Sequence, residues 1–189
     1  DKDSVNDRSE IAEDIGYLPS EVRYYERMRV KSFLDYAGSF YEDFDPAYQT
    51  ELVELLALDT SKRVGDLSLG NRKKVGVIQA FQHKPRLLML DEPTSGLDPL
   101  MQQKFFDLVE RHRHEGATVL FSSHVLSEVK RLSDRIAIIR EGVVRDINTV
   151  AELEQATHKL IHLVAAEEQL SVLDAQPGLE VTVSKPGER

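Results

Sequence analysis

Three short apolar stretches separated by segments of helical spacing constrain the fold of this 189-residue chain more than any other feature. The stretches are Leu87 to Leu90, Thr118 to Phe121 and Ile136 to Ile139. Strands that alternate with helices are typical of a parallel sheet with helices on both of its faces. The sequence therefore predicts an α/β fold in which these three stretches are strands of one sheet.

The rest of the chain predicts elements on either side of this core. Pro19 should end the first strand, because proline cannot donate to a ladder. A turn at Gly142 should lead into one more strand, and a small accessory α/β element should begin beyond Thr149. The expected elements are helices at 7–13, 30–41, after Pro46, 68–83 and 168–175, and strands at 15–18, 143–146, 160–164 and 179–183.

Composition excludes several classes of function. A net charge of -9 leaves no broad basic surface for nucleic acid, and the absence of cysteine excludes disulfide frameworks and thiolate zinc sites. No apolar run approaches the roughly 20 residues of a membrane-spanning helix. The polar, acidic residues 1–7 do not resemble a signal peptide. We interpret the short basic cluster Arg72 to Lys74 as a solvated helix face.

Polar side chains follow three of the predicted strands. Asp91 and Glu92 follow the strand at 87–90, Ser20 and Glu21 follow the strand at 15–18, and residues 122–124 follow the strand at 118–121. Ligands of open α/β sheets bind outside the carboxyl ends of the strands, so we expect these groups to lie on one edge. Paired carboxylates are costly to bury unless a cation or a reaction uses them, and Mg²⁺ with a water nucleophile would use both. In the alternative reading, Asp91 caps the next turn and Glu92 is solvated.

A serine opens the helix predicted at 68–83. The free N–H groups and the dipole of a helix start favour a bound phosphate, to which Ser68 adds a hydroxyl donor. The alternative for Ser68 is a simple N-cap. His124, after its strand, is likewise open to a structural or a catalytic reading.

The run Leu-Leu-Met-Leu-Asp-Glu-Pro-Thr-Ser-Gly-Leu-Asp-Pro at positions 87 to 99 resembles the Walker B motif and D-loop of ABC-type ATPases. Residues 67–71 resemble the signature motif of that family, His124 its switch histidine, and residues 17–21 its Q-loop. The resemblance covers roughly residues 11–146. The residues of the signature motif and the C-terminal tail are most similar to those of bacterial exporter cassettes of the ABC-2 group.

The resemblance implies a P-loop NTPase (RecA-like) parallel-sheet core with an inserted helical subdomain. It also implies that the chain is N-terminally truncated and carries the start of a small C-terminal accessory element. The expected parts are residues 1–26 as a remnant of the ATPase core with the Q-loop, 27–66 as the helical subdomain, 67–148 as the ATPase core, and 149–189 as the accessory element.

The resemblance also implies roles for residues of a site that holds ATP and Mg²⁺ between two cassettes. Asp91 would hold Mg²⁺ through water, Glu92 would polarise the attacking water, and His124 would contact the γ-phosphate. The remaining expected nucleotide contacts come from the signature and the two loops: Ser68, Gly70, Asn71, Asp98 and Ser20. Asp98 would link the two sites of a dimer.

The sequence departs from the family pattern at four points. Leu69 stands where the family commonly has Gly, Asn71 where it has Gln, and Ser20 where the Q-loop glutamine is expected. No Gly-x-x-x-x-Gly-Lys-[Ser/Thr] occurs among the 189 residues, which we expect to begin downstream of it. The segment that carries this motif should also supply a central strand with its helix, so we expect exposed apolar surface beside residues 87–90.

The partners that the resemblance implies are a transmembrane permease subunit and a second cassette, with no nucleic acid. The expected location is the cytoplasm, peripheral on the inner face of the cell membrane. Tyr24, Tyr25 and Met28 belong either to the surface that docks the membrane partner or to the core. Two alternatives remain open: a catalytically incomplete cassette fragment that donates its signature in trans, and a soluble ABC ATPase without a transport role.

Overall fold

A computed structural model of the chain describes residues 8–21 and 24–152. The chain divides into two units, residues 1–147 and 148–189, and the sheet and site described below belong to the first. The elements expected at 160–164, 168–175 and 179–183 lie outside the described residues. The described elements are α1 (Arg8–Glu13), β1 (Ile15–Leu18), α2 (Val30–Gly38), α3 (Pro46–Leu55), the 3₁₀ turn η1 (Val64–Asp66), α4 (Leu69–Phe81), β2 (Leu87–Asp91), α5 (Pro99–His114), β3 (Thr118–Ser122), α6 (Leu126–Leu132), β4 (Arg135–Arg140) and β5 (Val143–Thr149).

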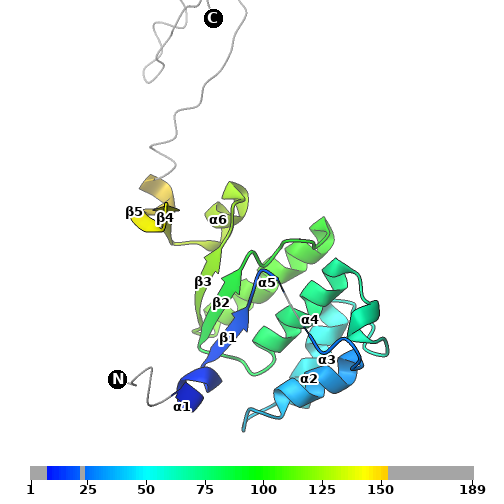
Figure 1. Cartoon of the computed structure of the whole chain (residues 1–189). Helices are drawn as coiled ribbons and strands as arrows, with labels where there is room; N and C mark the ends of the chain where they lie inside the picture. The colour runs from blue at the N-terminus through cyan, green and yellow to red at the C-terminus, as the bar shows by residue number, and fades with distance from the viewer. Residues whose placement is uncertain (1–7, 22–23, 153–189) are drawn as a thin grey trace, which may run out of the picture. The chain divides into compact units, whose positions relative to one another are not determined.

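Strands β1, β2 and β3 form a parallel sheet in that order (Figure 1). The register pairs Leu18 with Leu90 and Asp91 with Ser122, so the carboxyl ends of the three strands meet at one edge. The α/β fold with a parallel-sheet core is thereby confirmed, and the polar residues that follow each strand are brought to a common edge.

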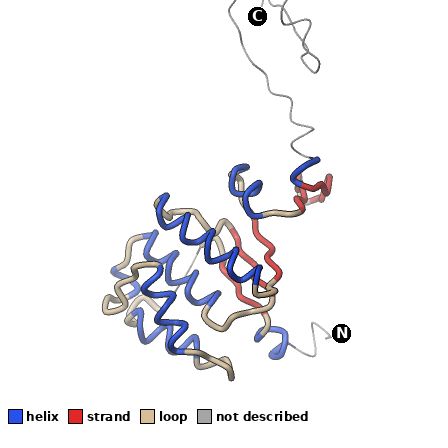
Figure 2. Tube along the Cα trace, turned by 180° about the vertical axis from the view of Figure 1, so that it is seen from behind, coloured by secondary structure: helices blue, strands red, loops and turns tan. Residues whose placement is uncertain are grey.

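One face of this sheet forms the core with α4 and α5, which lie on the same side of the strands in both views (Figures 1 and 2). The buried side chains Leu18, Leu88 and Leu90 alternate along β1 and β2 with less buried neighbours. Gly16 brings β1 close to α4, because a Cβ at this position would lie 2.1 Å from the carbonyl oxygen of Ala80. A residue without a side chain is therefore required where the helix crosses the strand.

The opposite face of the sheet, which we call the bare face, carries the row Tyr17, Met89 and Leu120. These residues are register partners across the three strands, and Tyr17 and Leu120 are 57% and 60% exposed. The prediction of helices on both faces is therefore wrong for the described residues. Successive side chains of a strand point to opposite faces of the sheet, and here apolar residues occur on both faces. The sequence pattern is therefore the same whether the second face is covered by helices or exposed. The predicted exposure of apolar surface beside residues 87–90 is confirmed.

The strand predicted at Ile136 to Ile139 exists as β4, but it is not part of the parallel sheet. It pairs with β5 in a separate two-stranded sheet. Glu141 and Gly142 both have left-handed backbone, with φ of 53° and 73°, and form the tight turn between the strands. An apolar run identifies a strand but not its partner, so the sequence placed β4 in the wrong sheet.

Helices α2 and α3 pack beside α4 and make the helical part of the first unit (Figure 1). Two buried glutamines fix this contact, since Gln49 Nε2 donates to Gln82 Oε1 at 3.0 Å and Gln82 Nε2 donates to the carbonyl oxygen of Leu34. The helix expected to reach Tyr41 ends at Gly38, and the Ser39 hydroxyl donates to the carbonyl oxygen of Tyr36. Within residues 8–21 and 24–152, no helix is long and apolar enough to cross a membrane.

Candidate nucleotide site

The carboxylate of Asp91 lies at the end of β2, beside the ends of the two neighbouring strands. The Ser122 hydroxyl donates to Asp91 Oδ1 at 2.5 Å and accepts from the backbone N–H of Glu92 at 3.1 Å. Hydrogen bonds from Ser122 and, to a smaller extent, from Ser20 hold the pKa of Asp91 below its ordinary value. Asp91 is therefore an ionised acceptor at neutral pH. Its carboxylate binds the Ser122 hydroxyl rather than a backbone N–H of the next turn.

Glu92 adopts a backbone conformation that is rare for a residue with a side chain. Its φ is 44°, in the left-handed region, where a non-glycine residue is strained. Its carboxylate accepts a hydrogen bond from His124 Nδ1 at 2.9 Å, and this contact raises the pKa of His124. Strain of this kind occurs often at functional sites, and the contact with His124 means that Glu92 is not a freely solvated carboxylate.

The start of α4 carries the signature residues. Ser68 is the N-cap, and its hydroxyl accepts from the backbone N–H of Asn71 at 3.4 Å. A Cβ on Gly70 would lie 2.6 Å from the carbonyl oxygen of Gly96, so α4 begins directly against the loop that follows β2. Leu69 is 74% exposed, and its side chain lies beside Gly96. The structural reading of Ser68 as an N-cap is thus correct, and it is compatible with a phosphate-binding role.

Asp98 is the N-cap of α5. Its side chain accepts from the backbone N–H of Met101 at 3.0 Å, and Pro99 occupies the first helical position. The residue itself remains exposed. A capping contact of this kind holds the loop between β2 and α5 in place, and it leaves the surface of Asp98 open to a second chain.

Lys73 is buried, contrary to the prediction of a solvated basic face for Arg72 to Lys74. It is 3% exposed, and its Nζ donates to the carbonyl oxygens of Pro19 and Ser20 at 3.2 Å and of Asp91 at 3.4 Å. Burial lowers the pKa of Lys73, and the charges of Asp91 and Glu92 oppose this shift. A run of basic residues on a helix does not show which of them turns inward, so this contact could not be predicted.

Glu128 on α6 makes a second buried polar contact that was not predicted from the sequence. This buried side chain accepts from Thr94 Oγ1 at 2.7 Å through Oε1 and from Ser123 Oγ at 2.6 Å through Oε2. Ser123 in turn accepts from the backbone N–H of Val125. Glu128 thus joins the loop after β2 to the loop that carries His124. A lone glutamate on a short helix is ordinarily solvated, so this contact could not be predicted from the sequence.

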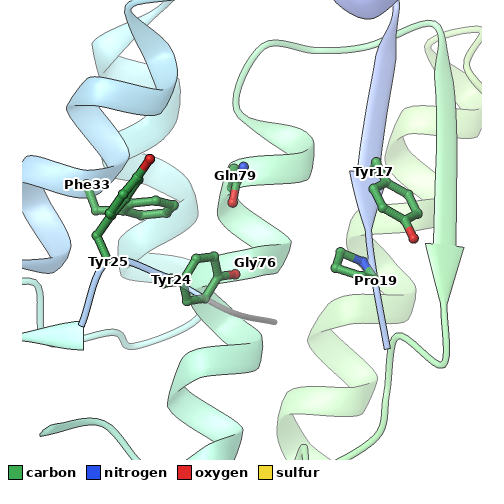
Figure 3. A pocket seen from close by; sticks show the side chains of 7 residues that line it. All are labelled: Tyr17, Pro19, Tyr24, Tyr25, Phe33, Gly76 and Gln79. Carbon is green, nitrogen blue, oxygen red and sulfur yellow. The ribbon is translucent and has the colours of Figure 1, made fainter. Parts of the chain in front are cut away.

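A pocket of about 470 Å³ opens beside the end of β1 (Figure 3). Tyr17 and Pro19 line one side of it and Tyr24 and Tyr25 the other, with Gly76, Gln79 and Phe33 completing the lining. Tyr24 packs against Phe33, and burial raises its pKa. Tyr25 is 64% exposed, so of the three residues considered for docking or core it is the one that lies at the surface.

The expected site residues fall into two groups. The first surrounds Asp91 and comprises Ser20, Asp91, Glu92 and His124. Ser122 joins Asp91 to the backbone of Glu92, whose carboxylate binds His124. The second comprises the start of α4 with Ser68, Gly70 and Asn71, which faces the loop leading to Asp98. The oxygen donors around Asp91 suit Mg²⁺, which prefers one or two carboxylates and keeps several waters. Among the described residues no three histidines or carboxylates converge on a metal site, so this group alone does not form a protein cage for a metal.

Comparisons with known proteins show the family of the chain. The family described as "AAA domain, putative AbiEii toxin, Type IV TA system" matches residues 3–129. An uncharacterized ABC transporter ATP-binding protein of Alkalihalophilus pseudofirmus is 31% identical over 92% of this chain and 67% of its own length. The ABC transporter ATP-binding protein YtrB of Bacillus subtilis is 25% identical over 96% of this chain and 65% of its own length.

Solved structures show the same fold. The structure titled "Structure of ATP binding subunit of ABC transporter" superposes with a TM-score of 0.74 at 25% identity, covering 82% of this chain and 66% of that one. A dimeric bacterial ABC transporter cassette, MJ0796, superposes with a TM-score of 0.68 at 19% identity, over 79% of this chain and 68% of that one. The fold is therefore that of a P-loop ATPase cassette.

The chain belongs to the family of ABC transporter ATP-binding proteins. It spans 67% of the length of the Alkalihalophilus pseudofirmus protein, 65% of the length of YtrB and 41% of the length of a further relative from Synechocystis.

Proposed function

We propose that this chain is part of the ATP-binding and ATP-hydrolysing subunit of an ABC transporter, which couples hydrolysis to export through a separate membrane subunit. The observation that carries the proposal is the strained Glu92, whose carboxylate is held by His124 directly beside the ionised Asp91. Family membership supplies the class of substrate. Residues 27–66 would serve as the helical subdomain and residues 67–148 as the main part of the ATPase core.

In the proposed reaction the oxygen of a water attacks the γ-phosphorus of ATP, and the bond to the β–γ bridging oxygen breaks to release ADP and phosphate. Mg²⁺, when bound, would neutralise charge on the phosphates. Asp91 would hold the metal through water, and Ser122 and Ser20 orient its carboxylate. Glu92 would accept a hydrogen bond from the attacking water. His124, whose Nδ1 is fixed by Glu92, would present Nε2 to an oxygen of the γ-phosphate.

The signature residues would complete a site on a second cassette. Ser68, Gly70 and Asn71 lie at the start of a 13-residue helix, where the dipole and free N–H groups favour a phosphate. Asp98, exposed at the start of α5, would contact the partner and link the two sites. The dimeric state of the MJ0796 cassette supports a paired arrangement for this chain as well.

The membrane subunit would dock at the pocket beside β1. The pocket joins the end of β1, next to Ser20, to α2 through Tyr24 and Phe33. Its lining is rich in tyrosine, the residue type that is enriched at protein interfaces. Docking there would place the chain at the inner face of the cell membrane.

A narrower function is supported by one observation on the sequence. The 189 residues contain no Gly-x-x-x-x-Gly-Lys-[Ser/Thr], and the contacts that this loop makes to phosphate are therefore not provided by them. These residues alone would be a cassette fragment that donates its signature to an intact partner and hydrolyses nothing.

The test is Glu92→Gln in the full-length parent protein. The amide keeps the size of the side chain and loses the charge that polarises water, so ATP binding should persist while turnover falls at least about 100-fold. Glu54→Gln, on the exposed surface of α3, is the matched control and should retain wild-type turnover. Steady hydrolysis by Glu92→Gln at the rate of the control would refute the assignment.

A further inference from the structure

Lys73 has no role in the reaction proposed above. It lies on α4 two residues after Asn71, and its side chain is buried in the interior. The three N–H donors of its ammonium match three backbone carbonyls, those of Pro19, Ser20 and Asp91. A charged group this deeply buried is costly unless its donors are satisfied, and here each has an acceptor.

These three carbonyls belong to two separate segments. Pro19 and Ser20 begin the loop after β1, and Asp91 ends β2. The last register pair of β1 and β2 is Leu18 with Leu90. Lys73 joins the two segments just beyond this pair. The ammonium therefore extends the connection between the strands past the last residue of the sheet.

The contacts of Lys73 also affect the surroundings of the Asp91 carboxylate. Ser20 lies close enough to this carboxylate for its hydroxyl and its backbone N–H to lower the pKa of Asp91. Both groups of Ser20 depend on the position of the loop, and Lys73 holds that loop through the consecutive carbonyl oxygens of Pro19 and Ser20. Position 20, where the family pattern has a glutamine, is a serine in this chain, and a lysine from α4 holds the loop that carries it.

We propose that Lys73 is a positioning residue of the ATP site, which ties the loop after β1 to the end of β2 and so holds Ser20 against Asp91. The inference rests on the proposed function for its role in metal binding, but the tie itself does not. The same loop continues into the lining of the pocket through Pro19. Lys73 thereby connects α4, the backbone of Asp91 and the loop that contributes Pro19 to the proposed docking surface.

The first experiment measures amide hydrogen exchange in the 189-residue chain. Lys73→Met keeps the length and helix preference of the side chain and removes the donors. We expect exchange of peptides covering residues 15–21 and 88–95 to quicken about tenfold, with the rest of α4 unchanged. Lys73→Arg keeps the charge and should restore much of the protection. Lys74→Met, one residue along α4, is the matched control. An equal effect of the two methionine variants, or faster exchange spread along α4, would overturn the tie.

The second experiment measures the Mg²⁺ dependence of ATP hydrolysis in the full-length parent protein. In Lys73→Met, Ser20 would no longer be held against Asp91, so the Mg²⁺ concentration for half-maximal rate should rise about tenfold. The hydrolysis rate should largely recover at saturating Mg²⁺, and Lys73→Arg should have an intermediate Mg²⁺ requirement. An unchanged Mg²⁺ requirement alongside altered exchange would refute the positioning role. If the wild-type parent hydrolyses no ATP, the proposed function fails, and the exchange experiment still decides whether Lys73 joins the two segments.

Discussion

Replacing Glu128 by alanine tests whether the buried contact between the two loops of the site is structurally important. The change leaves the hydroxyl of Thr94, a residue that is 4% exposed, without its acceptor. An unsatisfied buried donor costs about 1–3 kcal/mol. Loss of the γ-methylene of the side chain adds about 0.8 kcal/mol. Ser123 is only half-buried and can turn to water, so it adds little. We expect a loss of about 3 kcal/mol, a large share of the ~5–15 kcal/mol that stabilises a typical domain.

The assay is urea unfolding of the 189-residue chain followed by circular dichroism. A double-mutant cycle with Thr94→Val isolates the pair, and we expect a coupling energy of about 1–2 kcal/mol. Glu128→Gln keeps one acceptor oxygen and should cost roughly 1 kcal/mol, in the range of a single hydrogen bond. Glu54→Ala, on the exposed side of α3, should lie within about 0.5 kcal/mol of wild type. A loss below about 0.5 kcal/mol for Glu128→Ala would show that the carboxylate is not needed to join the loops.

Four further outcomes are expected. In the full-length parent, His124→Ala should lose turnover while ATP binding persists, and wild-type activity would make His124 merely structural. The 189-residue chain should bind Mg-ATP weakly or not at all in titration calorimetry and should self-associate in light scattering through its bare face; micromolar binding to a monomer would contradict both. Burial lowers the pKa of His112 below the ordinary 6.5, so the unfolded chain takes up the proton first and the free energy of unfolding should fall as the pH drops below about 6.5, with a smaller fall in His112→Gln. Gly16→Ala should lower stability by about 2 kcal/mol or more in urea unfolding, since the added methyl group would meet the backbone of α4.

Most of the strand positions could be predicted because they depend on local pattern. The runs at 15–18, 87–90 and 118–121 are strands within one residue of their expected ends, and Ser68 opens its helix as a capping residue should. The sequence also indicated that Asp91, Glu92 and His124 would meet, because the carboxyl ends of parallel strands share an edge. Their chemical roles remain predictions.

The errors concern partners rather than elements. The residues of β4 predict a strand equally well in either sheet, and only the tight turn at Glu141 and Gly142 gives it β5 as a neighbour. Lys73 and Glu128 are charged residues on helices, and such residues are ordinarily solvated. Each is buried because distant segments supply matching hydrogen-bond groups, and that match depends on tertiary structure. A single sequence contains no local signal for it.

The close approach of Gly70 to Gly96 leaves no clearance between the signature end of α4 and the loop after β2. The two backbones are packed too closely to move past each other, so we expect a shift of one to displace the other. A displacement of a few tenths of an ångström at Ser68 would therefore be passed to the loop before Asp98 without any rotation of a side chain. Rigidity between these loops would arise from the absence of a side chain at Gly70, and enlarging this residue would force the loops apart.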